Sequence, residues 1–313
     1  MNQPFKIISA TLITCMILPS CGMSQMHVVS DIEETFDGIE EIVIKGGALE
    51  VTYEGSDQAS DVFLNAYLES NRENGLEIIY KVEGKRLRVE LRRGNSNGWG
   101  NFKSKGFISL TGPENMKLQV NNSSGPMFIS NVKSDKIDLS ISSGRIEARQ
   151  LSSDRINLTA SSGKLEIEGI NGHLIGKISS GRGNISKVNG DVSVEASSGS
   201  YHISEVDGTV NGSLSSGSIT LEEIGELGSL TVSSGRIKAA HAGLGENTRF
   251  NGSSGSFVVQ TDSNLDDYNF DLSSSSGGLE VGDTKTRKNL NINNRSNITV
   301  SGSISSGRIS IQK

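Results

Sequence analysis

The tripeptide Ser-Ser-Gly occurs ten times in this 313-residue chain and constrains the fold more than any other feature. Successive copies are separated by 19, 19, 18, 18, 18, 18, 20, 22 and 30 residues. A repeat of this length indicates one structural unit per copy, stacked on its neighbours so that all of them share a core. The turn glycines are Gly125, Gly144, Gly163, Gly181, Gly199, Gly217, Gly235, Gly255, Gly277 and Gly307.

Apolar and polar residues alternate on both sides of each glycine. Two residues after the glycine lie side chains such as Ile146 and Leu165, and four residues after it lie Ile167 and Ile203. A period of two predicts strands with one buried face and one solvent face. The chain has only four prolines, as long hydrogen-bonded strands require, because proline cannot donate to a ladder.

Positions at the same distance from each turn glycine form a column, and each column keeps its residue type from copy to copy. The fold class follows from these columns. Parallel stacking of identical positions is favoured over a row of antiparallel hairpins, although a long twisted sheet remains an alternative. We expect an all-β, single-domain parallel β-solenoid, of the β-helix or β-roll type, with about ten rungs of 18–20 residues. Residues 36–120 are rich in irregular strand patterns and predict an N-terminal cap, and residues 121–313 predict the Ser-Ser-Gly solenoid.

The Ser-Ser-Gly tripeptide itself is expected to be a structural corner. Glycine allows the left-handed conformation of a sharp turn, and stacked serines could form a ladder of hydroxyl groups. A column of cations follows the glycines, as at Arg145 and Lys164, with glutamates such as Glu147 two residues further on. We expect this column to face solvent, where such pairs contribute little.

The N-terminus reads as a targeting segment. Lys6 precedes an apolar run that ends at Leu18-Pro19-Ser20-Cys21, which resembles the bacterial lipobox. We expect residues 1–20 to be a lipoprotein signal peptide, Cys21 to carry the lipid, and residues 21–35 to be a tether. An ordinary signal peptide with an incidental cysteine is the alternative.

One loop interrupts the strand patterns between Arg92 and Lys105. It holds the only tryptophan of the chain, Trp99, together with the basic residues Arg92, Arg93 and Lys103. An aromatic ring beside cations can stack on a sugar or lie at a membrane interface, so these four residues are candidate ligand contacts. A flexible loop without a ligand is the competing interpretation.

Several classes of function are disfavoured. The formal net charge of −6 argues against a nucleic-acid partner. The four histidines lack metal-ligand spacing, and no catalytic constellation or cofactor motif is present, so we expect no metal, no cofactor and no enzyme activity. The last strand pattern, Ile309-Ser310-Ile311, has almost no cap after it, which predicts an open edge that could pair with another chain.

The combination of a lipobox, the opening Phe36-x-x-Ile39 and the repeated Ser-Ser-Gly-x-Ile-x-Ile unit resembles the bacterial "putative adhesin" family. That family is a domain of unknown function, related to the head-GIN autotransporter adhesin domain. The resemblance covers residues 36–313 and implies an envelope-exposed protein without enzymatic activity. It carries over no ligand-binding residue.

These observations favour a lipid-anchored protein of the cell envelope, at the outer membrane, that presents a rigid solenoid for adhesion or protein interaction. Its partners would be the membrane, through the lipid, and a protein or glycan ligand. A periplasm-facing structural or stress-related module that binds a protein is the second hypothesis. A solenoid carbohydrate-active enzyme is the third.

Overall fold

The computed structural model describes residues 25–72, 75–94 and 103–313. Within them the chain forms 25 strands, all joined in one hydrogen-bonded sheet, and a single short 3₁₀ helix, η1 (Leu265–Asp267). The all-β prediction is therefore confirmed. The signal peptide, Cys21 and Trp99 lie outside the described residues.

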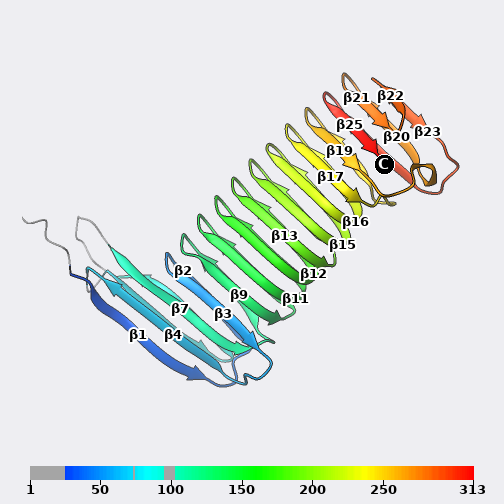
Figure 1. Cartoon of the computed structure of the whole chain (residues 1–313). Helices are drawn as coiled ribbons and strands as arrows, with labels where there is room; N and C mark the ends of the chain where they lie inside the picture. The colour runs from blue at the N-terminus through cyan, green and yellow to red at the C-terminus, as the bar shows by residue number, and fades with distance from the viewer. Residues whose placement is uncertain (1–24, 73–74, 95–102) are drawn as a thin grey trace, which may run out of the picture.

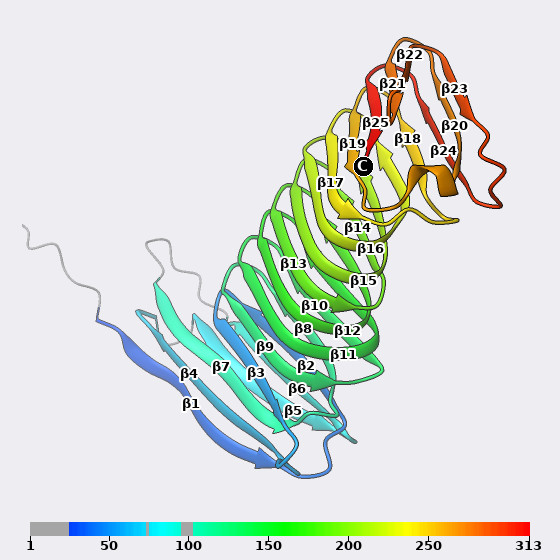
Figure 2. The ribbon, with the colours of Figure 1, turned by 45° about the vertical axis from the view of Figure 1, so that its right-hand side comes forward.

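The strands are arranged in two layers that face each other across the core (Figures 1 and 2). A rung consists of one strand before a turn and one strand after it, and each strand pairs in parallel with the equivalent strands of the neighbouring rungs. The layer before the turns contains β6 (Arg86–Arg93), β2 (Glu41–Gly47), β8 (Lys117–Asn122), β10 (Lys136–Ile141), the second halves of β11 (Arg145–Ala160) and β12 (Lys164–Ile178), β14 (Val192–Ala196), the second halves of β15 (Ser200–Leu214) and β16 (Ser218–Val232), β18 (Arg249–Gly252), β24 (Thr299–Ile304) and β20 (Asn269–Ser274).

The layer after the turns follows the same spatial order. It contains β7 (Ser104–Pro113), β3 (Glu50–Ser56), β9 (Met127–Lys133), the first halves of β11 and β12, β13 (Arg182–Asn189), the first halves of β15 and β16, β17 (Arg236–Ala242), β19 (Ser256–Gln260), β25 (Arg308–Gln312) and β21 (Gly278–Val281).

The core is built from the columns that the two-residue period predicted. Ile146 pairs with Leu165 and Ala148 with Ile167, and all four side chains are buried. The register is unbroken from Arg145 to Ser153 and shifts only at the turn between Ser153 and Arg155, so the apolar columns of both strands stay inside.

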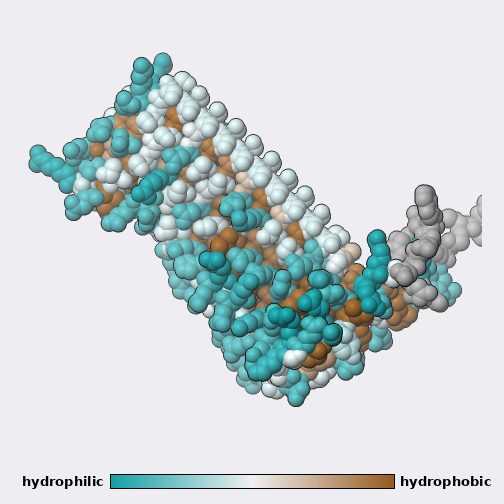
Figure 3. Space-filling model, turned by 180° about the vertical axis from the view of Figure 1, so that it is seen from behind, coloured by the Kyte–Doolittle hydropathy of each residue, from teal (hydrophilic) through white to brown (hydrophobic). Residues whose placement is uncertain are grey.

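The Ser-Ser-Gly corners are held by backbone hydrogen bonds rather than by hydroxyl groups. Ser180 N donates to Ser161 O at 2.8 Å and Ser198 N to Ser179 O at 2.7 Å, and the pattern repeats along the stack. The hydroxyls point outward and form the pale strip along one edge in Figure 3. The expected hydroxyl ladder is reduced, within the described residues, to one contact between Ser276 and Ser306 at 2.9 Å.

The corner glycines also have a different role from the expected one. Among the ten, only Gly217 and Gly307 have a positive φ, so a left-handed conformation is not what requires glycine. The requirement is a close approach between rungs: a β-carbon on Gly163 would lie 2.5 Å from the carbonyl oxygen of Gly144. The missing side chain lets each corner rest on the backbone of the one below it.

The N-terminal end is closed by antiparallel strands. β4 (Val62–Ser70) pairs with β7, β1 (His27–Phe36) pairs with β4, and β5 (Leu76–Glu83) pairs with β6. The expected tether over residues 21–35 is thus a strand from His27 onward, because Val29, Ile32 and Phe36 pack against the core. The rung β2–β3 lies between β6–β7 and β8–β9 and pairs with both in parallel. Part of the predicted cap, residues 36–120, therefore forms rungs of the two layers.

The C-terminal end is closed by β22 (Thr284–Thr286) and β23 (Asn289–Ile292), which pair antiparallel with β21 and β20. The rung β24–β25 does not lie at the edge of the stack. It lies between β18–β19 and β20–β21, and Ile309 and Ile311 are fully buried. The predicted open edge at Ile309–Ile311 is therefore wrong. The last two strands of the chain are inserted between two rungs that precede them in the sequence.

Candidate binding grooves at the second corner

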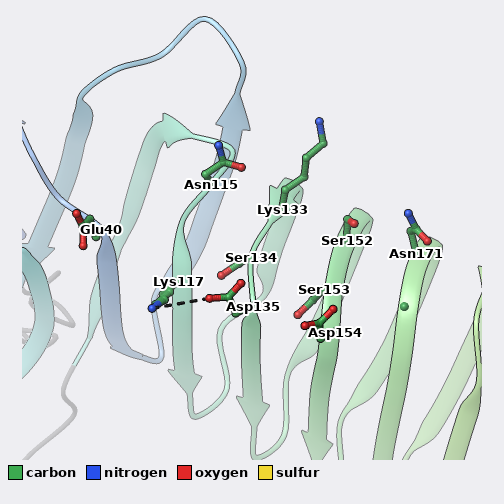
Figure 4. A pocket seen from close by; sticks show the side chains of 11 residues that line it. Glu40, Asn115, Lys117, Lys133, Ser134, Asp135, Ser152, Ser153, Asp154 and Asn171 are labelled. Atoms are coloured by element: carbon green, nitrogen blue, oxygen red, sulfur yellow. Dashed lines mark ion pairs between the residues drawn. The ribbon is translucent and has the colours of Figure 1, made fainter.

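Each rung turns again on the edge opposite the Ser-Ser-Gly corners, and we call this turn the second corner. A groove of about 630 Å³ crosses the second corners of the rungs that contain β2, β8, β10, β11 and β12 (Figure 4). We call it the corner groove. It is lined by Glu40, Asn115, Lys117, Lys133, Ser134, Asp135, Ser152, Ser153, Asp154, Asn171 and Gly172.

Charged groups of both signs line the corner groove. Lys117 Nζ lies 3.9 Å from Asp135 Oδ2, a loose pair whose carboxylate is 84% exposed. Lys133 Nζ donates to Glu114 Oε1 at 2.8 Å, and this bond together with the carboxylate charge raises the pKa of Lys133. Lys133 therefore stays cationic at neutral pH. Asp154 has no ion pair within the described part of the chain.

The serines of the corner groove hold the backbone rather than face a ligand. Ser153 Oγ donates to Arg155 O at 3.0 Å and accepts from Arg155 N at 3.2 Å. Ser134 makes the equivalent, longer contacts with Lys136, at 3.4 and 3.5 Å. Asn115, Asn171 and the carboxylates are thus the groups whose donors and acceptors are directed at the groove.

A second groove of about 560 Å³ lies on the other side of the same corners. Lys133, Ser152 and Asn171 line both grooves and form the ridge between them. Here the backbone of Asn131, Gln150 and Gly169 is left-handed, with φ of 56°, 54° and 72°. The same left-handed conformation recurs at the equivalent position of the later rungs, at Lys187, Glu205, Glu223 and His241, so it is a general property of the second corner.

The chemistry of the corner groove suits binding of a polar ligand. The carboxylates of Glu40 and Asp135 are 65% and 84% exposed. Carboxylate, amide and ammonium groups around one hollow can exchange hydrogen bonds with hydroxyl groups, and charged ones among them are the stronger partners.

A third hollow, of about 570 Å³, follows the Ser-Ser-Gly edge between Ser143 and Ser218. It is lined by corner serines and glycines together with Lys164 and Arg182. The amides of both corner serines and of the residue after the glycine already donate to the rung below, as Ser161 N, Ser162 N and Lys164 N do.

The residues singled out in the sequence lie elsewhere. Arg92 and Arg93 end β6 and Lys103 precedes β7, at the edge of the Ser-Ser-Gly corners. Arg92 Nε and Nη2 donate to Glu77 Oε1 at 2.8 and 2.6 Å, so its charge is compensated within the cap. Lys103 N donates to Asn71 Oδ1 at 2.9 Å. With Trp99 outside the described residues, ligand contact by these four residues stays a prediction.

The corner groove itself was missed in the sequence, although a signal exists. Asp135 and Asp154 each lie ten residues after a turn glycine, and Asn171 belongs to one of the turn pairs at the second corner. Counting ten residues onward from each turn glycine, instead of four, places these two carboxylates at the same position of adjacent rungs.

No helix among the described residues is long and apolar enough to cross a membrane. No group of three or more histidine, cysteine, aspartate or glutamate side chains in that part of the chain is arranged to hold a metal ion.

Comparisons with known proteins identify a family. The family model described as Toastrack DUF4097 matches residues 39–312. No curated protein sequence matches the chain significantly.

Two solved structures resemble the chain over most of its length. A "putative lipid binding protein" from Parabacteroides distasonis ATCC 8503 is 18% identical, with a TM-score of 0.45 over 93% of this chain and 98% of that one. A "putative adhesin" from Bacteroides fragilis NCTC 9343 is 12% identical, with a TM-score of 0.37 over 92% and 97% of the two chains. At these identities and TM-scores neither structure establishes a shared function.

Proposed function

Since the chain belongs to the Toastrack DUF4097 family, we propose that it is a lipid-anchored protein of the cell envelope that works by adhesion. In this proposal the stacked rungs form a rigid parallel β-solenoid, and the corner groove binds a hydroxyl-rich ligand such as a glycan. The protein acts as a binding module, not as an enzyme.

The observation that carries the proposal is the corner groove on an otherwise repetitive stack. Most of the outer surface repeats from rung to rung, and the grooves at the second corners are where carboxylates, amides and cations converge. A ligand site needs a few polar groups that fix orientation, and the groove supplies them from five neighbouring rungs.

The position of the proposed anchor supports the envelope location. Cys21 precedes the first described strand residue, His27, by six residues, which span at most about 21 Å when extended. A lipid on Cys21 would hold the β1 end of the stack close to the membrane. A multiply acylated cysteine anchors stably, whereas one acyl chain binds only marginally.

Location is tested by protease treatment of intact cells that express the wild-type chain or Cys21→Ala. We expect the wild-type chain to be cut at the cell surface and the variant to appear in the medium or the soluble fraction. Cleavage in lysed cells only would contradict adhesion to outside surfaces and would favour the periplasm-facing module.

Ligand binding is tested with the double variant Asp154→Ala/Asn171→Ala on an array of envelope and host glycans. We expect it to lose binding at least tenfold, about the effect of two polar contacts. The matched control, Asp207→Ala/Asn189→Ala, removes the same residue types from second corners that lie outside both grooves. Equal binding by the two double variants would contradict the proposed site.

A further inference from the structure

The C-terminal end of the stack is not built in chain order. After β19 the chain passes over one level, forms β20–β21 with the antiparallel strands β22 and β23, and returns through residues 293–298. It then fills the skipped level with β24–β25 (Figures 1 and 2). We call the skipped level the slot, and β24–β25 the inserted rung.

The inserted rung connects the end of the molecule to the rest. β24 pairs with β18 on one side and β20 on the other, and β25 pairs with β19 and β21. Among the described strands, neither β20 nor β21 pairs with β18 or β19. The side chains that fill the slot are fully or almost fully buried: Val300, Ile304, Ile309 and Ile311.

The walls of the slot match each other in register. Phe250 and Leu272 both lie opposite Gly302, and Phe257 and Leu279 both lie opposite Ile309. The two walls are therefore complete rungs that recognise any strand pair with the inserted rung's pattern. Nothing in the pairing distinguishes a rung of the same chain from an identical rung of another copy.

The hinge before the inserted rung is a compact loop held by the side chains of Asn269, Asn294 and Ser296. Asn269 Oδ1 accepts from Asn294 N at 2.9 Å and from Ser296 N at 3.2 Å, and Asn269 Nδ2 donates to Ser296 O at 2.7 Å. Arg295, between them, has a left-handed backbone with φ 61°, which is unfavourable for a residue with a side chain. Short strained hinges favour exchange of an element between identical chains.

We infer that the inserted rung exchanges between two copies of this chain, each copy's β24–β25 filling the other's slot. Exchange preserves every pairing and every buried contact of the inserted rung, because the donor and the slot are identical in both copies. Only residues 293–298 change their path, and six residues reach about 21 Å when extended. The partner is thus a second copy, and the interaction surface is the slot.

A mixed-cysteine experiment tests the inference on the full chain, with Cys15→Ser and Cys21→Ser removing its two cysteines. Arg249 of β18 lies opposite Ser301 of β24, at a strand separation that a disulfide can bridge. One preparation carries Arg249→Cys, the other Ser301→Cys, and the two are mixed at high concentration under oxidising conditions. Exchange yields a disulfide-linked heterodimer on a non-reducing gel.

The control pair is Ser193→Cys with Asn211→Cys, which lie opposite each other in two central rungs. We expect heterodimer from the slot pair only. Asn269→Ala, which removes three of the hydrogen bonds that hold the hinge, is expected to raise its yield about tenfold, the effect of losing two or three weak hydrogen bonds.

Two results would overturn the inference. One is the absence of heterodimer under conditions where the double variant Arg249→Cys/Ser301→Cys closes its own disulfide, which shows that the pair itself is competent. The other is an equal yield from the central control pair, because that indicates general unfolding rather than exchange at the slot.

Discussion

Gly181 lies so close to Gly163 that a β-carbon on Gly181 would be only 1.9 Å from the Gly163 carbonyl oxygen. Contact between two backbones, rather than an unusual φ angle, therefore requires glycine at this corner. Gly181→Ala would push two rungs apart at the point where Ser180 N and Arg182 N donate to the rung below.

We expect Gly181→Ala to lower the free energy of unfolding by about 2–3 kcal/mol, as overpacking of a close contact does. Urea unfolding followed by circular dichroism measures the change. The matched control is Gly278→Ala, because a β-carbon on Gly278 would meet no atom within 4 Å. Similar losses for both variants would show that the close contact is not the reason for glycine at this corner.

Gly169 is one of the residues with left-handed backbone at the second corner, and substitutions there measure what this conformation costs. Its φ is 72°, and a β-carbon there would approach Gln150 N only to 3.5 Å, an ordinary contact. Gly169→Ala therefore introduces backbone strain without a clash, and we expect it to cost about 1 kcal/mol. Gly169→Asn should cost less, because asparagine tolerates this conformation and Asn131 adopts it at the equivalent position two rungs earlier. Thermal unfolding of the two variants checks the order, and a larger cost for asparagine would contradict it.

Tyr201 carries a buried hydroxyl group without a hydrogen-bond partner among the described residues. Its ring occupies the space that Gly183 leaves in the rung below, where a β-carbon would lie 2.4 Å from Tyr201 Cδ1. We expect Tyr201→Phe to raise the free energy of unfolding by about 1 kcal/mol, because the ring stays and the unpaired group is lost. Chemical denaturation gives the value, and a clear loss of stability would indicate that the hydroxyl has a partner after all.

The same residue predicts how stability depends on alkaline pH. Burial raises the pKa of Tyr201 and of Tyr53 above the ordinary value of about 10. Above about pH 10 the unfolded chain loses these phenolic protons while the folded chain keeps them, so the free energy of unfolding falls as pH rises. Well below pH 10 both states keep the protons, and the two tyrosines add no pH dependence.

Well above pH 10, each buried tyrosine adds about 1.4 kcal/mol per pH unit to that fall. Between pH 10 and 11 the unfolded tyrosine is only partly ionised, so Tyr201→Phe should make the slope of unfolding free energy shallower by about 1 kcal/mol per pH unit. An unchanged slope would mean that Tyr201 is ionised in the folded state.

Much of the centre of the fold could be predicted from the sequence. Leu165 and Ile167 follow Gly163 at the second and fourth positions, and both are buried as the count required. Such columns are predictable because each rung contacts only its neighbours, so one spacing determines all pairings.

The order of the rungs at the two ends could not be predicted in this way. Gly277 follows Gly255 in the sequence, but Gly307 lies between them in space. The alternation that identifies Ile309 and Ile311 as core residues is the same in every rung, so it does not tell which neighbours they have. Long insertions between the last copies were the only sign of a change in order.

The corner groove was only partly predictable for a related reason. The spacing from the turn glycines places Asp135 and Asp154 on adjacent rungs, but they interrupt no pattern, since polar residues are expected at every second corner. What makes them a candidate site is the hollow beside the ridge of Lys133, Ser152 and Asn171, and residue types alone do not reveal that shape.

The order of the strands also determines how the molecule folds. In the middle of the stack, paired residues such as Arg182 and Ser200 are 18 positions apart, whereas β2 pairs Glu41 with Lys117, 76 positions away, and β19 pairs Ser256 with Arg308, 52 away. Closing a longer loop costs more entropy and slows folding. The central rungs should therefore form first, and the closing of the two ends should limit the rate at which the native protein appears.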